Sequence, residues 1–200
     1  MTSPCWRART TAPTGARSPP AWAASNAVTL LVPYGIRPEQ AWPSLLARQL
    51  AEKRLDYSVA NLSISGETTA GGRARLPAAL RQHKPAVVVI ALGANDGLRG
   101  LPLDQMRDNL LAMLDAAQAA GARTLLVGVR LPPNYGPYAS EFDRSFAEVA
   151  SQKKSARLDF LLAPIAAERN YFQADNLHPT AEAQPLLLDT VWPSLQPLLK

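Results

Sequence analysis

The chain has 200 residues, of which 47% are hydrophobic, so it is long and apolar enough to bury the core of one ordinary domain. Its net charge is +5, and because Arg7, Arg9 and Arg17 lie in a leading segment without acidic residues, only +2 belongs to the rest. Such a small excess does not indicate a nucleic-acid partner. The single cysteine, Cys5, excludes an internal disulfide and any multi-cysteine metal site.

Residues 1–26 combine prolines with small polar residues and show no apolar periodicity, which predicts a disordered leader or the remnant of a signal peptide. The run Ala21-Trp22-Ala23 resembles a small-residue cleavage site, but no apolar h-region precedes it, and a chance match in an alanine-rich segment is the alternative. No stretch approaches the roughly 20 apolar residues of a membrane-spanning helix, so we expect no stable membrane insertion.

From Ala27 onward, predicted strands and helices alternate. The strand candidates are Ala27 to Val32, Ser58 to Ile64, Ala86 to Leu92, Arg123 to Arg130 and Leu158 to Leu162. The helical stretches between and after them are Pro38 to Leu55, Thr68 to Gln82, Leu103 to Ala120, Tyr138 to Lys154 and Thr180 to Leu199. This alternation predicts a single domain over residues 27–200, an α/β three-layer sandwich with a five-stranded, mainly parallel sheet of the flavodoxin-like type.

One predicted helix shows its buried face in the sequence. Between Leu103 and Ala120, leucines and two methionines recur at spacings of three and four residues, which is typical of a helix packed on a core. Gly121 follows the last turn in the position of a C-terminal cap.

The central strand ends in a polar turn. The run Val87 to Leu92 is almost continuously aliphatic, as in a parallel strand covered on both faces, and Gly93-Ala94-Asn95-Asp96-Gly97 follows it directly. Because ligands of open parallel sheets bind beyond the carboxyl ends of the strands, we expect the chemistry of the chain near this turn.

The chain has two histidines, and they differ in setting. His83 ends a predicted helix, where a cation complements the helix dipole. His178 lies in the loop Asp175-Asn176-Leu177-His178-Pro179, and one tight turn can bring Asp175 against a ring nitrogen, as a nucleophile-activating histidine requires. The alternative is that Asp175 caps the following helix and His178 is a surface residue.

Four segments in this order resemble the SGNH or GDSL hydrolases, within their bacterial arylesterase, lysophospholipase and thioesterase I branch. The resemblance spans residues 27–200, and the segments that carry it are LSISGETTAGGRARLP, ALGANDGLRG, RLPPNYG and DNLHPTAEAQ. It implies hydrolysis of aryl esters, short or medium acyl esters, thioesters or lysophospholipids through an acyl-enzyme. No cofactor or metal is implied, and the oligomeric state is left open. Members are often periplasmic or secreted, whereas this chain as written lacks an h-region and would stay cytoplasmic.

The resemblance also implies roles for individual residues. His178 would be the general base and Asp175 its orienting carboxylate, while Gly66 and Asn95 would donate N–H groups to the oxyanion hole. The loops after GAND and around RLPPNYG border the acyl pocket in this family, which makes Leu98, Leu101 and Tyr135 candidate substrate contacts. Ordinary loop packing explains these apolar residues equally well.

The block that carries the nucleophile is missing. In this family the first strand runs into Gly-Asp-Ser-Leu-Ser, a short spacer and a tyrosine, whereas here Val32 is followed by Pro33-Tyr34-Gly35. We therefore expect a deletion that removes the nucleophilic serine. Four other serines are considered as replacements, and none is favoured. Ser25 lies before the first predicted strand and Ser44 within a predicted helix, so both are expected to face the wrong way. Ser63 and Ser65 precede Gly66, and the strand would have to distort to aim either hydroxyl at His178. An altered reading frame, a gene-model error or deliberate editing would explain both the deletion and the unusual leader.

Two functions stay open at this point. The first is a serine esterase, and the second is a defective relative that binds acyl ligands without covalent turnover. A flavodoxin-like nucleotide binder is disfavoured, because no strand is followed by a glycine-rich phosphate loop.

Overall fold

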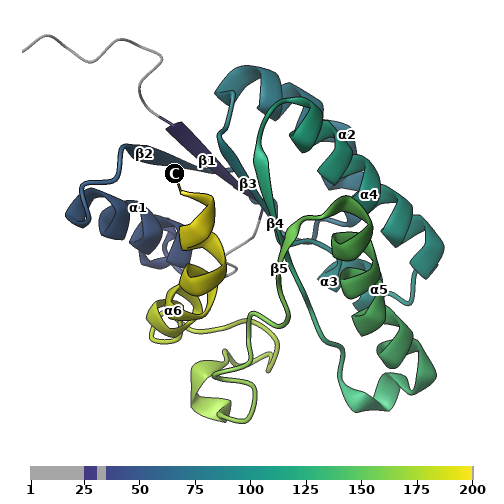
Figure 1. The fold of residues 1–200 in the computed structure, drawn as a ribbon. Helices are drawn as coiled ribbons and strands as arrows, with labels where there is room; N and C mark the ends of the chain where they lie inside the picture. Colours follow the sequence, from purple (N-terminus) through teal and green to yellow (C-terminus); the bar gives the residue numbers. More distant parts are fainter. Residues whose placement is uncertain (1–24, 31–34, 200) are drawn as a thin grey trace, which may run out of the picture.

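The computed structural model describes residues 25–30 and 35–199. Most of the predicted leader, including the Ala21-Trp22-Ala23 run and Cys5, lies outside the described residues, as do Pro33 and Tyr34 at the expected deletion. The described chain forms a parallel sheet between two layers of helices, which confirms the predicted α/β sandwich (Figure 1).

The sheet has the strand order β2-β1-β3-β4-β5, and every pair of neighbours is parallel. The strands are β1 (Ser25–Leu30), β2 (Tyr57–Asn61), β3 (Val87–Ile90), β4 (Arg123–Val127) and β5 (Ala156–Leu158). Because the order reverses beside β1, where β2 lies on one side and β3 on the other, ligands are expected at the carboxyl ends of these strands.

The helices divide between the two faces of the sheet. They are α1 (Trp42–Glu52), α2 (Thr69–His83), α3 (Ala94–Leu98), α4 (Leu103–Ala119), α5 (Pro137–Lys153) and α6 (Gln184–Leu195), with short 3-10 turns at Pro38–Gln40, Pro133–Tyr135, Arg169–Tyr171 and Gln196–Leu198. Helices α1 and α6 cover one face, and α2, α4 and α5 cover the other (Figure 1).

The central strand β3 supplies both halves of the core. Val88 and Ile90 pack under α2, α4 and α5, whereas Val87 and Val89 pack under α1 and α6, and all four are fully buried. Alternate residues of a strand point to opposite faces, so a strand covered on both sides must be apolar throughout. This explains the continuous aliphatic run that marked the strand in the sequence.

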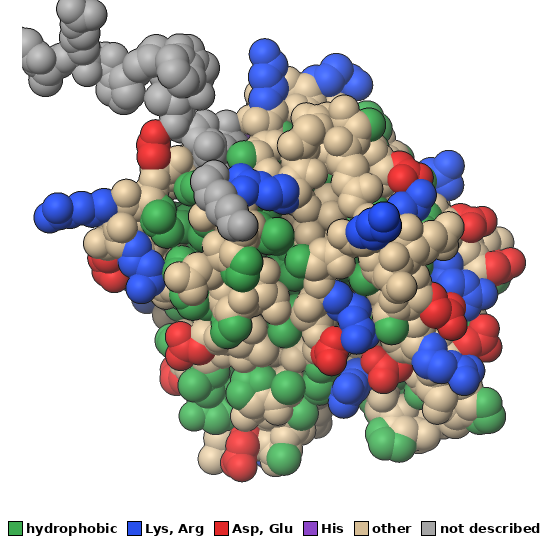
Figure 2. All heavy atoms as spheres, viewed as in Figure 1, with side chains coloured by type: hydrophobic (Ala, Val, Ile, Leu, Met, Phe, Trp, Pro, Cys, Tyr) green, Lys and Arg blue, Asp and Glu red, His purple; other side chains and the backbone are tan. Residues whose placement is uncertain are grey.

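The predicted apolar stripe on α4 is part of this core. Its leucines and methionines, together with Ala117, are buried against β3 and β4, which confirms their structural role. The face seen in Figure 2 intersperses Lys and Arg with Asp and Glu and collects no extended patch of one sign. No helix among the described residues is long and apolar enough to cross a membrane.

Several predicted boundaries were wrong. The last strand was placed at Leu158 to Leu162, but β5 spans Ala156–Leu158 and the chain then turns, so that Leu161 packs beneath α6 instead of extending the sheet. The first predicted helix breaks at Ala41, whose ψ of 146° is extended. The last helix begins at Gln184 and not at Thr180, because the Thr180 N–H donates to the Tyr171 carbonyl.

Candidate active site

A short helix follows the central strand. The segment GAND was predicted as a turn, but Ala94–Leu98 forms α3, entered through Gly93 at φ +116°. A Cβ at position 93 would lie 2.9 Å from Cζ of Phe146, so both the backbone angle and the packing require glycine there. This tight entry places Asn95 and Asp96 directly beyond the carboxyl end of β3.

The loop between β2 and α2 lies against α3. Asn95 Nδ2 donates to the Glu67 carbonyl at 3.1 Å, and the Arg99 guanidinium donates to the Gly66 carbonyl at 3.0 Å. Gly66 has φ +73°, a left-handed conformation that glycine adopts without strain. The structure therefore brings Gly66 and Asn95, the two predicted oxyanion donors, to neighbouring positions.

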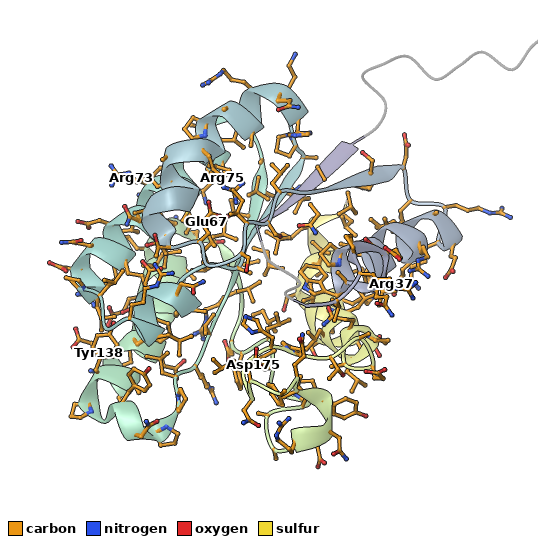
Figure 3. The ribbon with its side chains drawn as sticks, turned by 180° about the vertical axis from the view of Figure 1, so that it is seen from behind. Arg37, Glu67, Arg73, Arg75, Tyr138 and Asp175 are labelled. Carbon is orange, nitrogen blue, oxygen red and sulfur yellow. The ribbon has the colours of Figure 1, made fainter. Side chains whose placement is uncertain are left out.

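An ion pair with α2 fixes the side chain of Glu67. The Glu67 side chain is 7% exposed and its carboxylate pairs with the guanidinium of Arg75; Figure 3 shows the two residues side by side at α2. The ion pair holds the residue whose carbonyl receives Asn95, and sequence reasoning had missed it. Glu67 and Arg75 are eight positions apart, and this spacing does not predict an ion pair, because only the turn into α2 brings the two side chains together.

The predicted histidine and carboxylate are in direct contact. His178 Nδ1 lies 2.7 Å from Asp175 Oδ2, while Asp175 Oδ1 accepts the backbone N–H groups of Leu177 at 2.9 Å and His178 at 3.0 Å. The hydrogen bond from the His178 ring, followed by those two backbone N–H groups, holds the pKa of Asp175 well below its usual range. The carboxylate is thus ionised at neutral pH and favours a proton on Nδ1.

A narrow hairpin presents this pair. Phe172 and Pro179 form an antiparallel bridge, and the Gln173 N–H donates to the His178 carbonyl at 2.8 Å. Asn176 at the tip has φ +60°, so the chain reverses between Asp175 and His178. Asp175 lies in the segment between β5 and α6, and Figure 3 shows it apart from the Glu67 and Arg75 side chains at α2. The alternative, in which Asp175 caps α6, is wrong because α6 begins nine residues later.

A pocket of about 660 Å³ connects the hairpin with α3. It is mainly apolar and lies at the carboxyl edge of the sheet, where an open α/β sheet binds ligands. Its lining comprises Ala94, Asn95, Leu98, Val129, Arg130, Leu131, Pro132, Pro133, Phe160, Leu162, Ala166, Phe172, Asn176, Leu177 and His178.

The predicted substrate contacts divide into two groups. Leu98 lines the pocket, whereas Leu101 and Tyr135 are not among its lining residues. Tyr135 instead donates its hydroxyl to the Leu98 carbonyl at 3.2 Å, and Tyr138 donates to the Leu101 carbonyl at 2.7 Å. The first hydrogen bond joins the loop RLPPNYG to the end of α3, and the second joins α5 to the loop after α3, so Tyr135 holds the backbone of Leu98.

Sequence reasoning missed the far wall of the pocket. Phe160, Leu162 and Ala166 contribute to it from the turns that follow β5. The pattern at Leu158 to Leu162 predicts a strand, and a strand prediction alone does not place its apolar residues in a pocket. Only the structure shows that β5 ends at Leu158 and that these residues lie beyond its carboxyl end.

No serine is among the described residues that line the pocket. The Ser44 hydroxyl donates to the Pro38 carbonyl at 2.8 Å, and the Ser63 hydroxyl donates to Asn61 Oδ1. Ser65 is exposed in the turn before Gly66, and the side chain of Ser25 is not described. Within the described ranges, no group of His, Cys, Asp and Glu side chains forms a metal-binding cluster.

At the carboxyl edge of a parallel sheet, the His178–Asp175 pair and Asn95 meet at one apolar pocket, which is the arrangement of the general base and oxyanion donor in hydrolases of the α/β class. The chain belongs to the GDSL-like Lipase/Acylhydrolase family, whose profile matches residues 14–185. This confirms the resemblance seen in the sequence.

Named relatives support the same assignment. Esterase TesA of Pseudomonas aeruginosa is 51% identical over 166 residues, which cover 82% of this chain and 83% of that protein. Thioesterase 1/protease 1/lysophospholipase L1 of Escherichia coli is 39% identical over 167 residues, covering 83% of this chain and 79% of its own length. A crystal structure of TesA has a TM-score of 0.84 at 47% identity and covers 88% of this chain and 99% of its own.

Proposed function

We propose that this chain is a carboxylic ester hydrolase whose site is the pocket between α3 and the Asp175–His178 hairpin. The observation that carries the proposal is that His178, held by Asp175 at 2.7 Å, opens with Asn95 into the same apolar pocket. The relatives named esterase, arylesterase and thioesterase support the reaction class.

His178 serves as the general base. Asp175 accepts the hydrogen bond of Nδ1, which leaves Nε2 as the ring atom that takes a proton from the attacking group and returns it to the leaving group. The ionised carboxylate stabilises the imidazolium that forms between these two steps. The low pKa of Asp175 suits this role, because the carboxylate stays charged throughout the neutral range.

The oxyanion hole combines a backbone and a side-chain donor. An Asn amide has two N–H groups, and one Nδ2 hydrogen of Asn95 is held by the Glu67 carbonyl, so the other is oriented towards the reacting carbonyl oxygen. Gly66 contributes its backbone N–H from the adjoining loop. A donor fixed before the substrate arrives stabilises the developing charge without reorganisation.

The pocket favours short or medium acyl and aryl groups. A volume of about 660 Å³ lies within the range of small-molecule sites, and Leu98 and Phe160 offer apolar walls to the acyl chain. We therefore propose small-molecule esters or thioesters as substrates, with the acyl chain lying along Leu98.

One observation favours a second candidate function. No serine lines the described pocket. In this second candidate function, the chain binds acyl ligands without forming an acyl-enzyme. A site that lacks one member of the triad retains about 10³- to 10⁴-fold catalysis over water through the oxyanion hole and binding, so slow turnover alone does not identify a serine nucleophile.

Covalent labelling with a fluorophosphonate separates the two candidates, because this probe requires a histidine-activated serine. The label is followed by intact mass in the full chain, in His178→Ala and in the control His83→Ala, which alters the histidine at the end of α2. An adduct that is lost only in His178→Ala supports the esterase, and peptide mapping then names the serine. A folded chain without any adduct supports acyl binding alone.

A further inference from the structure

A buried carboxylate beside the site has no part in the proposed chemistry. Asp96 is 3% exposed, follows Asn95 on α3 and is not among the residues that line the pocket. Its Oδ2 accepts the backbone N–H of Thr69 at 2.9 Å, and its Oδ1 accepts the Thr69 hydroxyl at 2.5 Å. Thr69 is the first residue of α2, where the helix dipole also favours a negative charge.

The hydroxyl of Thr69 is fixed from a second side. Asn109 of α4 donates its Nδ2 to Thr69 Oγ1 at 3.2 Å, and Arg73 donates to Asn109 Oδ1 at 3.2 Å. Thr69 is fully buried, so its hydroxyl must donate to Asp96 while it accepts from Asn109. This chain of hydrogen bonds defines one orientation for the start of α2 relative to α3.

Side chains of α3 and its C-cap therefore hold the loop Gly66–Thr69 at successive points. Asn95 bonds the Glu67 carbonyl, Arg99 bonds the Gly66 carbonyl, and Asp96 bonds the backbone and side chain of Thr69. Of these contacts, only that of Asp96 is buried. A buried charged hydrogen bond resists exchange with water, so it constrains the loop more than the exposed Arg99 contact does.

We propose that Asp96 is the positioning residue of the oxyanion hole. By locking Thr69 to α3, its carboxylate fixes the separation between the Gly66 N–H and the Asn95 amide. The inference rests on the proposed function, because it assigns Asp96 to the same hole. A displacement of about 1 Å in such a site lowers the rate on the order of 100-fold.

The test compares Asp96→Ala, Asp96→Asn and Thr69→Val with Leu50→Ala, a core substitution on α1 in the opposite helix layer. Two readouts are taken from each full-length variant. The first is kcat and KM for a p-nitrophenyl ester. The second is the side-chain amide signals of Asn95 in a nitrogen-15 NMR spectrum, which report its hydrogen bond to Glu67 whether or not the chain turns over.

Asp96→Ala is expected to lower kcat on the order of 100-fold with little change in KM and to shift the Asn95 amide signals. Asp96→Asn keeps an oxygen acceptor for the Thr69 N–H and should restore most of both. Leu50→Ala should lower the melting temperature and leave both readouts unchanged. If Asp96→Ala does not fold, Thr69→Val tests the same contact by removing only the hydroxyl.

Unchanged Asn95 signals in Asp96→Ala and Thr69→Val would overturn the inference. Equal effects of Leu50→Ala and the Asp96 variants would also overturn it, because Asp96 would then act through general stability. A parent chain without turnover would count against the proposed function alone, and the NMR comparison would still decide the role of Asp96.

Discussion

Replacing Asn95 by alanine should damage catalysis far more than folding. The substitution removes one part-buried hydrogen bond, from Nδ2 to the Glu67 carbonyl at 3.1 Å, which lowers the free energy of unfolding by about 1 kcal/mol. It also removes a donor from the oxyanion hole, which costs about 2.7 to 4 kcal/mol in the transition state, or a kcat lower by about 10²- to 10³-fold. The catalytic loss should therefore exceed the stability loss severalfold.

A matched control is Gln118→Ala on α4. Gln118 Nε2 donates to Thr124 Oγ1 at 3.3 Å and to the Lys153 carbonyl at 2.9 Å, so its removal also deletes amide hydrogen bonds, but far from the pocket. Both variants are assayed for kcat and KM on a p-nitrophenyl ester and for unfolding in urea. The reasoning is refuted if Asn95→Ala and Gln118→Ala lose stability equally and also have equal kcat.

Further predictions concern backbone strain, pH and acyl length. Gly93→Ala should lower the free energy of unfolding by about 1 to 3 kcal/mol in urea melts, because φ +116° and the Phe146 ring both oppose a Cβ, whereas Gly100→Ala, with open space around its Cβ, should cost less. Because the pKa of Asp175 is lowered in the folded state, its carboxylate stabilises the fold at pH values above the ordinary carboxyl pKa of 3.8, and this stabilisation is lost as the pH falls below that value. Asp175→Asn should therefore flatten the acid side of a plot of unfolding free energy against pH. An unchanged acid side would be evidence against the ion pair. Leu98→Trp should narrow the pocket and shift the ratio of kcat/KM towards shorter acyl esters, and a constant ratio across chain lengths would remove Leu98 from the acyl site.

The sheet and helix layers were predictable from local pattern. The aliphatic run of β3 and the three- and four-residue spacing on α4 are properties of short segments, so periodicity located them well. The ends of β5 and α6 were not predictable in this way. Leu161 is placed by its packing against α6, which is distant in sequence. Thr180 is placed by its hydrogen bond to the Tyr171 carbonyl, which forms only because the chain reverses between the two residues.

The candidate site was predicted in part for a similar reason. Asp175 and His178 are three residues apart, so a single turn brings them together and the sequence alone suggested the pair. Asp96 and Thr69 are 27 positions apart, and only the packing of α3 against α2 makes them neighbours. The roles of Gly66, Asn95, Asp175 and His178 stay predictions until they are tested by substitution.

The measurement that tests the central claim most directly is the rate at which the full chain hydrolyses p-nitrophenyl octanoate, compared with His178→Ala and His83→Ala. Turnover is expected in the parent and in His83→Ala, and a large loss of turnover is expected in His178→Ala. Equal rates in the two histidine variants, or a parent rate no higher than that of the uncatalysed reaction, would contradict this claim.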